Sequence, residues 1–111
     1  MSNEPDAIVR SYFDRMLARD LSVVDLFHED ASLIGLGGVK SGKAAIREFY
    51  ENSIREASPS PNLVGEPLTS GSRVAVEINI TLSGASSVHV VDLFVVEDGL
   101  IRSLTYFIAD H

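Results

Sequence analysis

Residues 88–107, VHVVDLFVVEDGLIRSLTYF, have the pattern of two apolar strands joined by a turn, and this hairpin is the strongest structural signal in the chain. The dipeptide Asp98-Gly99 is typical of a tight hairpin turn, because both residues tolerate the positive φ angles that such turns require. Segment 88–96 is apolar at odd and at even positions, a pattern typical of a strand covered on both faces. We therefore predict that this hairpin lies at the centre of an antiparallel sheet.

The segments before and after this hairpin extend the predicted sheet. Residues 73–82 alternate between apolar and other side chains, which predicts a strand with one buried face. A further strand is expected at 63–69, because a Ser-Gly-Ser turn separates that segment from the alternating one. Residues 100–109 close the meander. From residue 63 onward, the chain therefore has the two-residue period of strands.

The first half of the chain is predicted to be mainly helical. A helix that begins near Pro5 carries apolar residues at helical spacing, namely Ile8, Val9, Tyr12, Phe13, Met16 and Leu17. A second, short helix is expected at 21–27, and a short strand at 31–36. Ser41 is the predicted cap of a third helix, which the proline-containing segment 57–62 ends.

Length and composition limit the classes of function that are open to this chain. Its 111 residues suffice for one domain, so we expect a single α+β domain over residues 1–111. The net charge of -7 and the scattered basic residues argue against a nucleic-acid partner. No cysteine, signal peptide or long apolar helix is present, which predicts a cytoplasmic protein with no membrane partner.

No cofactor or metal is predicted. The glycine-rich segment 35–43, GLGGVKSGK, resembles a phosphate-binding loop, but Ala44 stands where the magnesium-binding hydroxyl would have to be. A connector that needs glycine for backbone freedom explains the segment better. The three histidines, His28, His89 and His111, lack the paired spacing of metal ligands.

Asp92 is the most unusual residue of the chain. It lies in the most apolar segment, and alternation places it on the same face as Val90 and Phe94. An ionised carboxylate on a buried apolar face is costly, so such a group either finds a partner or stays protonated with a raised pKa. Because both faces of this strand are apolar, an outward position in a subunit interface is an equal alternative.

The order and spacing of three segments resemble the nuclear transport factor 2-like superfamily, in its ketosteroid isomerase and SnoaL-like branch. These segments are YFDRMLARDLSVVDLFHEDASL at 12–33, SGKAAIREFY at 41–50 and VVDLFVVEDGLIRSLTYF at 90–107. The resemblance implies a cone-shaped, curved antiparallel sheet wrapped around three N-terminal helices, as in cystatin-like folds. It also implies an apolar pocket inside the cone and a homodimer formed through the outer sheet face.

The resemblance to ketosteroid isomerases implies a catalytic set of three residues in this pocket. Tyr12 matches a tyrosine that donates to the ligand oxygen, Asp92 matches a protonated aspartic acid beside it, and Tyr50 matches a supporting tyrosine. The ligand-binding positions that it implies are Met16, Phe27, Leu36, Phe49, Val76, Ile78, Val90, Leu104, Tyr106 and Ile108, with Val74 and Val88 as further wall residues.

The sequence departs from the isomerases at Gly35. That position matches the acidic residue that moves the proton between two carbon atoms, and glycine has no side chain to do so. A positioned base contributes roughly 10²–10⁴-fold to a proton transfer. We therefore expect a protein that binds a flat, steroid-like hydrophobic molecule but turns it over weakly.

Three other interpretations stay open. In the first, the protein is a SnoaL-like cyclase, isomerase or hydrolase whose base lies elsewhere, although Asp14, Asp30, Glu77 and His89 are poorly placed for that role. In the second, it is a dimeric module that binds no ligand, and side chains fill the inside of the cone. A redesigned pocket, an engineered small-molecule binder, would account for the loop residues Leu36, Gly37 and Gly38.

Overall fold

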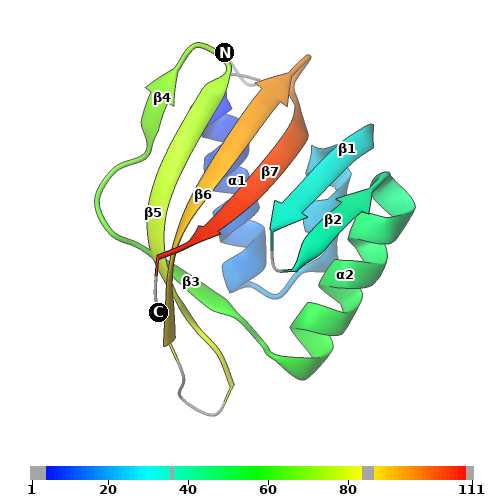
Figure 1. Ribbon diagram of the computed structural model, residues 1–111, viewed down its shortest axis with the longest axis vertical. Helices are drawn as coiled ribbons and strands as arrows, with labels where there is room; N and C mark the ends of the chain where they lie inside the picture. The colour runs from blue at the N-terminus through cyan, green and yellow to red at the C-terminus, as the bar shows by residue number, and fades with distance from the viewer. Residues whose placement is uncertain (1–4, 36, 84–86, 110–111) are drawn as a thin grey trace.

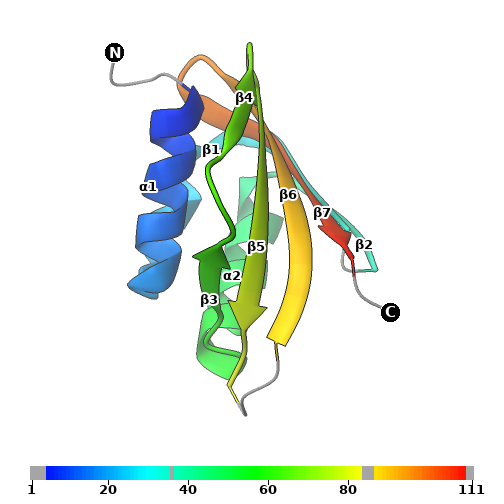
Figure 2. The same cartoon turned by 90° about the vertical axis from the view of Figure 1, so that its left-hand side faces the viewer.

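The computed structural model describes residues 5–35, 37–83 and 87–109 and shows helices packed on a curved sheet. Two α-helices and a short 3-10 helix lie on the concave side of the sheet (Figures 1 and 2). The elements are α1 (Pro5–Leu17), η1 (Leu21–Leu26), β1 (Phe27–Gly35), β2 (Gly38–Ser41), α2 (Lys43–Glu56), β3 (Ser60–Leu63), β4 (Leu68–Ser70), β5 (Arg73–Thr81), β6 (Ser87–Glu97) and β7 (Leu100–Ile108).

The sheet has the strand order β2-β1-β7-β6-β5-β3. Strand β4 pairs with the same edge of β5 as β3 does, at the opposite end of β5. Strands β5, β6 and β7 form the predicted antiparallel meander, with Asp92 opposite Val76 on one side and Tyr106 on the other. One pair differs from the predicted antiparallel pattern, because β1 runs parallel to β7. The chain crosses from β1 to β7 through all the elements between them, so the two strands can run in the same direction.

The glycine-rich segment contains strand β2, which forms a hairpin with β1, and Gly35, Gly37 and Gly42 in this segment have the positive φ angles that a connector made of glycine allows. Strand β1 begins at Phe27, four residues before the predicted start, and pairs with β2 so that Gly35 lies opposite Gly38. The predicted helix at 21–27 is a 3-10 helix, and Gly42 rather than Ser41 is the cap of α2. Hairpin pairing holds Ser41 in the last position of β2, which leaves the cap to the next residue.

The predicted strand at 63–69 is two short strands. Strand β3 begins at Ser60 and β4 begins at Leu68, and both pair with β5. Pro61 lies within β3, which is possible because β3 is the last strand of the sheet and needs hydrogen bonds on one side only. The proline-containing segment therefore follows the end of α2, and Pro61 is part of the edge strand β3.

The core lies between the helices and the concave face of the sheet. Helix α1 buries Ile8, Tyr12 and Met16, and α2 buries Ile46 and Tyr50, in each case with a spacing of four residues. On β6, the inward-pointing side chains from Val90 to Val96 are buried, whereas the outward-pointing side chains from Val91 to Val95 are only half-buried. The helices therefore cover one face of this strand, and the predicted cover of its other face is not found within the described residues. Within the described residues, no helix has the length and the apolar character needed to cross a bilayer.

Candidate functional site

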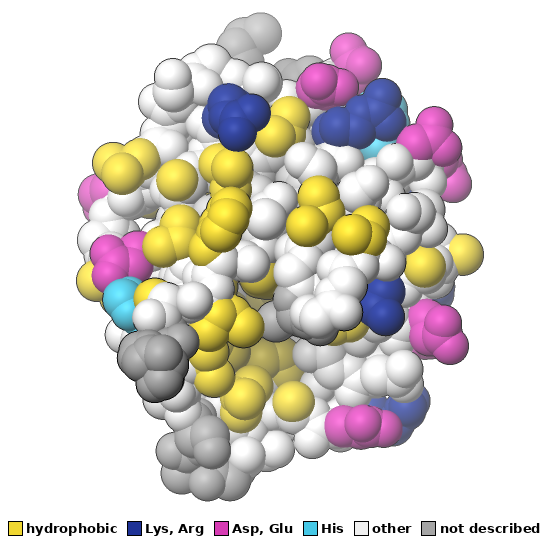
Figure 3. Space-filling model, viewed as in Figure 1, with side chains coloured by type: hydrophobic (Ala, Val, Ile, Leu, Met, Phe, Trp, Pro, Cys, Tyr) yellow, Lys and Arg dark blue, Asp and Glu magenta, His cyan; other side chains and the backbone are white. Residues whose placement is uncertain are grey.

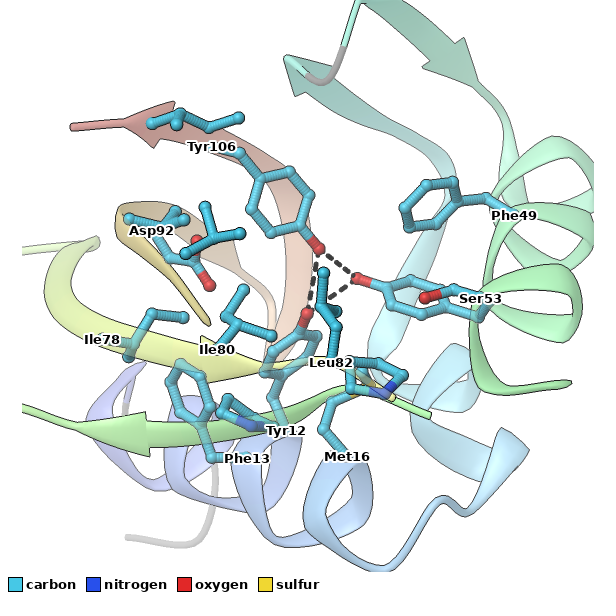
Figure 4. Close-up of a pocket in the computed structure, with 16 residues that line it drawn as sticks. Tyr12, Phe13, Met16, Phe49, Ser53, Ile78, Ile80, Leu82, Asp92 and Tyr106 are labelled. Atoms are coloured by element: carbon cyan, nitrogen blue, oxygen red, sulfur yellow. Dashed lines mark hydrogen bonds between the residues drawn. The ribbon is translucent and has the colours of Figure 1, made fainter. Parts of the chain in front are cut away.

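A cavity of about 190 Å³ lies between the two α-helices and strands β3, β5, β6 and β7. The helices contribute Tyr12, Phe13, Met16, Phe49, Tyr50 and Ser53, and the sheet side contributes Pro59, Pro61, Ile78, Ile80, Leu82, Val88, Val90, Asp92, Tyr106 and Ile108. Figure 4 shows these side chains converging on one space. A hollow lined by hydrophobic side chains is visible between the end of β7 and α2 in Figure 3.

Three tyrosine hydroxyl groups meet on the wall of this cavity. The Tyr12 and Tyr50 oxygens are 2.8 Å apart, the Tyr50 and Tyr106 oxygens 2.8 Å, and the Tyr12 and Tyr106 oxygens 3.1 Å (Figure 4). A phenolic hydroxyl donates one hydrogen bond, so three hydrogen bonds use all three protons. We call these residues the tyrosine triangle.

Burial keeps the tyrosine triangle neutral. Desolvation raises the pKa of Tyr12, Tyr50 and Tyr106, because an ionised phenolate would lose its contact with water. The charges of Tyr50 and Asp92 raise the pKa of Tyr12 and Tyr106 further. None of the three hydroxyls can therefore act as a base near neutral pH.

Asp92 is the carboxyl group of this cavity. Its side chain is only 1% exposed, and neither carboxyl oxygen has a hydrogen-bond partner among the described residues. Burial raises the pKa of this carboxyl well above its usual value, which favours the protonated form. The predicted inward position of Asp92 is thus the one adopted, and the outward alternative is wrong.

Most of the residues expected from the sequence meet in this cavity. Tyr12, Tyr50 and Asp92 do so, and the predicted ligand-binding residues that line it are Met16, Phe49, Ile78, Val90, Tyr106 and Ile108, together with the wall residue Val88. Leu36 lies outside the described residues.

Four of the predicted wall positions lie in the solid core instead. These are Phe27, Val74, Val76 and Leu104, which are at most 1% exposed and do not line the cavity. The ring of Phe94 fills that end of the cone, because it packs 5.0 Å from the Tyr12 ring and 5.8 Å from the Phe13 ring. Because the Phe94 ring fills the cone, Asp92 is the last residue of β6 that lines the cavity. Strand alternation identifies which side chains face the concave side, but it does not show where the cone closes.

Other lining residues were missed. Ile80 and Leu82 belong to the same alternating stripe as Ile78, and Ser53 follows Phe49 by four residues on α2, so periodicity could have identified them. Phe13, Pro59 and Pro61 also line the cavity. The two prolines do so because β3 continues the sheet, which the sequence pattern did not indicate.

Gly35 lies away from this cavity. It lines a smaller, adjoining pocket with Leu33, Gly37, Gly38 and Lys40, and the ring of Phe49 borders both spaces. Its φ angle is +113°, and a Cβ atom built there would lie 2.7 Å from the backbone oxygen of Tyr106. In this geometry position 35 has no room for a side chain.

The described residues contain no group of three or more His, Cys, Asp or Glu side chains arranged to hold a metal ion. Glu77 and His89, two of the residues considered as a relocated base, form a 2.6 Å contact with each other on the outer face of the sheet. Their side chains are 47% and 45% exposed, respectively. Among residues 5–35, 37–83 and 87–109, no ionisable residue lines the cavity apart from Asp92 and the tyrosine triangle.

Comparisons with known proteins agree with this fold. The family model for a SnoaL-like domain matches residues 9–104, whereas no curated protein matches the chain. A candidate polyketide cyclase from Sinorhizobium meliloti is 25% identical, with a TM-score of 0.81 over 89% of this chain and 92% of that one. A candidate ketosteroid isomerase from Kribbella flavida is 24% identical, with a TM-score of 0.85 over 96% and 78%.

An NTF2-like protein from Cytophaga hutchinsonii shares the fold at 15% identity, with a TM-score of 0.83 over 95% of this chain and 89% of that one. The family match covers most of the chain, and the helices and the curved sheet have the arrangement of NTF2-like folds. The chain therefore belongs to the SnoaL-like domain family and has an NTF2-like fold.

Proposed function

We propose that this protein binds a flat, apolar small molecule that has one polar end, and that it catalyses isomerisation weakly or not at all. The observation that carries this proposal is Asp92, a carboxyl group without a partner at the inner end of an apolar cavity. An unsatisfied buried polar group destabilises a protein by about 1–3 kcal/mol. A ligand whose polar end bonds Asp92 offsets that loss, whereas its apolar body matches the rest of the wall.

Weak or absent turnover follows from the groups on the cavity wall. Proton transfer between carbon atoms needs a positioned base, which is worth roughly 10²–10⁴-fold. Asp92 and the tyrosine triangle are the ionisable groups that line the cavity, and burial favours the neutral form of each. They suit the donation of a hydrogen bond rather than the removal of a proton.

The size of the cavity favours a ligand of one or two rings. Apolar cavities of about 150 Å³ hold a molecule of the size of benzene, and pockets for drug-sized ligands measure about 300–1,000 Å³. The present cavity of about 190 Å³ lies near the lower end of this scale. A four-ring steroid would extend beyond it, so we narrow the expected ligand to small aromatic or alicyclic molecules.

Binding can be tested with 2-naphthol, a fluorescent bicyclic phenol. We expect binding to the wild-type protein, and an affinity about tenfold lower or worse in Asp92→Leu, because this variant has no polar group at the inner end. Ile80→Phe should prevent binding by filling the cavity. Asn79→Phe is the matched control, because residue 79 is exposed on the opposite face of β5. Equal binding by wild type and Ile80→Phe would contradict the proposed site.

We also propose that the partner of the outer sheet face is a second copy of this chain. On this face Leu68, Ala75, Leu93 and Thr105 form a row across four paired strands, and the Phe107 side chain is 53% exposed. Hydrophobic side chains gather along the meander in the view of this face (Figure 3). Such an apolar face is typical of subunit interfaces.

Sedimentation velocity tests the proposed dimer. We expect a dimer for the wild-type protein and a monomer for Leu93→Lys, because a charge at the centre of an apolar interface is poorly tolerated. Ala44→Lys, an equal change of charge on the exposed side of α2, should remain dimeric. A wild-type monomer at high micromolar concentration would refute this assembly.

A further inference from the structure

The closed tyrosine triangle leaves Asp92 as the free hydrogen-bonding group at the inner end of the cavity. Each tyrosine hydroxyl can donate to one neighbour and accept from the other, so the triangle satisfies itself. A ligand oxygen could bond Tyr12 only after one of these three bonds had broken. The two oxygens of Asp92, by contrast, have no partner among the described residues.

The protonation state of Asp92 defines what it offers to a ligand. A protonated carboxyl group carries one O–H donor on one oxygen and one acceptor on the other, about 2 Å apart in the same plane. The titratable groups that face it are Tyr12 from α1, Tyr50 from α2 and Tyr106 from β7, all of them neutral. Within the part of the chain that the structure describes, no charged side chain lines the cavity and competes for either oxygen.

We propose, on the basis of the binding function above, that the preferred ligand carries a hydrogen-bond donor and acceptor on adjacent atoms, as a lactam or another cis amide does, and pairs both with Asp92. The Asp92 hydroxyl donates to the ligand carbonyl oxygen. The ligand N–H donates to the other Asp92 oxygen. The two parallel bonds satisfy both atoms that the protein alone leaves unpaired.

Ligands with a single polar atom satisfy this group only in part. A ketone or a lactone accepts the Asp92 proton but leaves the second oxygen of Asp92 without a donor. Sites built to bond a particular N–H or O–H group discriminate strongly against analogues that lack it, because a buried protein atom is then left unpaired. The preference for a paired donor and acceptor should therefore exceed the preference for any particular ring system.

The surroundings of Asp92 favour a planar end on the ligand. The carboxyl group is 1% exposed, and Figure 4 shows it among the side chains of Ile78, Ile80 and Tyr106. A ligand reaches it when the aliphatic side chains of Ile78 and Ile80 rotate aside. A flat amide edge needs the smallest such displacement, and a fused bicyclic lactam suits the volume of about 190 Å³.

Two bicyclic probes of nearly equal shape test this proposal. Isoquinolin-1(2H)-one is a lactam, and isocoumarin has a ring oxygen in place of the N–H group. In calorimetric titrations near pH 5, we expect the lactam to bind wild type about tenfold or more tightly than isocoumarin. Asp92→Asn should keep this preference, because an amide also has a donor and an acceptor. Asp92→Leu should remove it.

The pH dependence separates a paired interaction from general apolar binding. Ionised Asp92 has no donor to offer a ligand carbonyl, so the affinity of wild type for isocoumarin, which depends on that one bond, should fall as pH rises through the pKa of this group, whereas the affinity of Asp92→Asn should stay constant. If the lactam and isocoumarin bind wild type equally, and 2-naphthol binds in its own titration, the paired interaction is overturned but the binding function is not. Failure of all three probes to bind would overturn the binding function as well.

Discussion

Asp92→Asn is expected to be more stable than the wild-type protein at neutral pH and about equally stable near pH 4. In the unfolded chain this carboxyl ionises at its ordinary pKa, whereas burial raises the pKa in the folded protein. Between these two pKa values the folded state binds one proton more, so the free energy of unfolding falls as pH rises. The slope is about 1.4 kcal/mol per pH unit until the folded-state pKa is passed.

The sign of this effect distinguishes Asp92 from an ordinary surface carboxylate. A carboxyl group whose folded-state pKa is lowered by a salt bridge adds stability above its unfolded pKa, whereas Asp92 reduces stability there. The tyrosine triangle stays neutral across this range because burial raises each pKa. Surface groups are shared by both proteins, so they cancel in the difference between wild type and variant.

Urea unfolding of both proteins at intervals from pH 4 to pH 8 measures this difference. Asp14→Asn is the matched control, since Asp14 is exposed on α1 and its curve should run parallel to that of wild type. Asp92→Leu should be more stable still, because it removes polar atoms that lack partners, an effect of about 1–3 kcal/mol. Parallel curves for wild type and Asp92→Asn would show that Asp92 is ionised in the folded protein.

Gly35→Asp should destabilise the fold and leave isomerase activity unchanged. Two separate effects oppose any side chain at this position. The φ angle of +113° is strained for every residue except glycine, which costs about 1–3 kcal/mol. A Cβ atom would also lie 2.7 Å from the Tyr106 backbone oxygen, and such overpacking costs about 1–3 kcal/mol more.

The neighbouring glycines provide matched controls for each effect. Gly37 has a φ angle of +90° and nothing within 4 Å of a built Cβ atom, so Gly37→Ala measures backbone strain alone. Gly38 is equally open and lacks a positive φ angle, so Gly38→Ala should be nearly neutral. The expected loss of unfolding free energy therefore increases from Gly38→Ala through Gly37→Ala to Gly35→Ala.

Chemical denaturation and an assay with a β,γ-unsaturated ketosteroid test the Gly35 variants. If Gly35→Ala is no more destabilising than Gly37→Ala, the close approach to Tyr106 is not a constraint. If Gly35→Asp folds normally and raises the isomerisation rate, then a carboxylate at position 35 can reach the ligand. That outcome would contradict the separation of this residue from the cavity by Phe49.

The periodicity of apolar residues was sufficient to predict helix α1 and strands β5 and β6. The helical stripe of α1 and the two-residue alternation of β5 and β6 follow from burial of one face, which sequence spacing records directly. Alternation also narrowed the position of Asp92 to one of two faces. The β1–β2 hairpin and the start of β3 were missed, because glycine and proline mark breaks in most contexts but can also occupy turns and sheet edges.

Local spacing in the sequence therefore predicted the α+β class, the central meander and the apolar stripe of α1, whereas the residues of the site were implied by the family resemblance. The inward position of Asp92 without a partner, the closure of three tyrosine hydroxyls into a triangle and the place of Gly35 outside the cavity came from the three-dimensional structure alone. These facts depend on distances between side chains on α1, α2, β6 and β7. Such distances are set by how the sheet curves and where the Phe94 ring closes the cone, and neither is encoded in the spacing of any single segment.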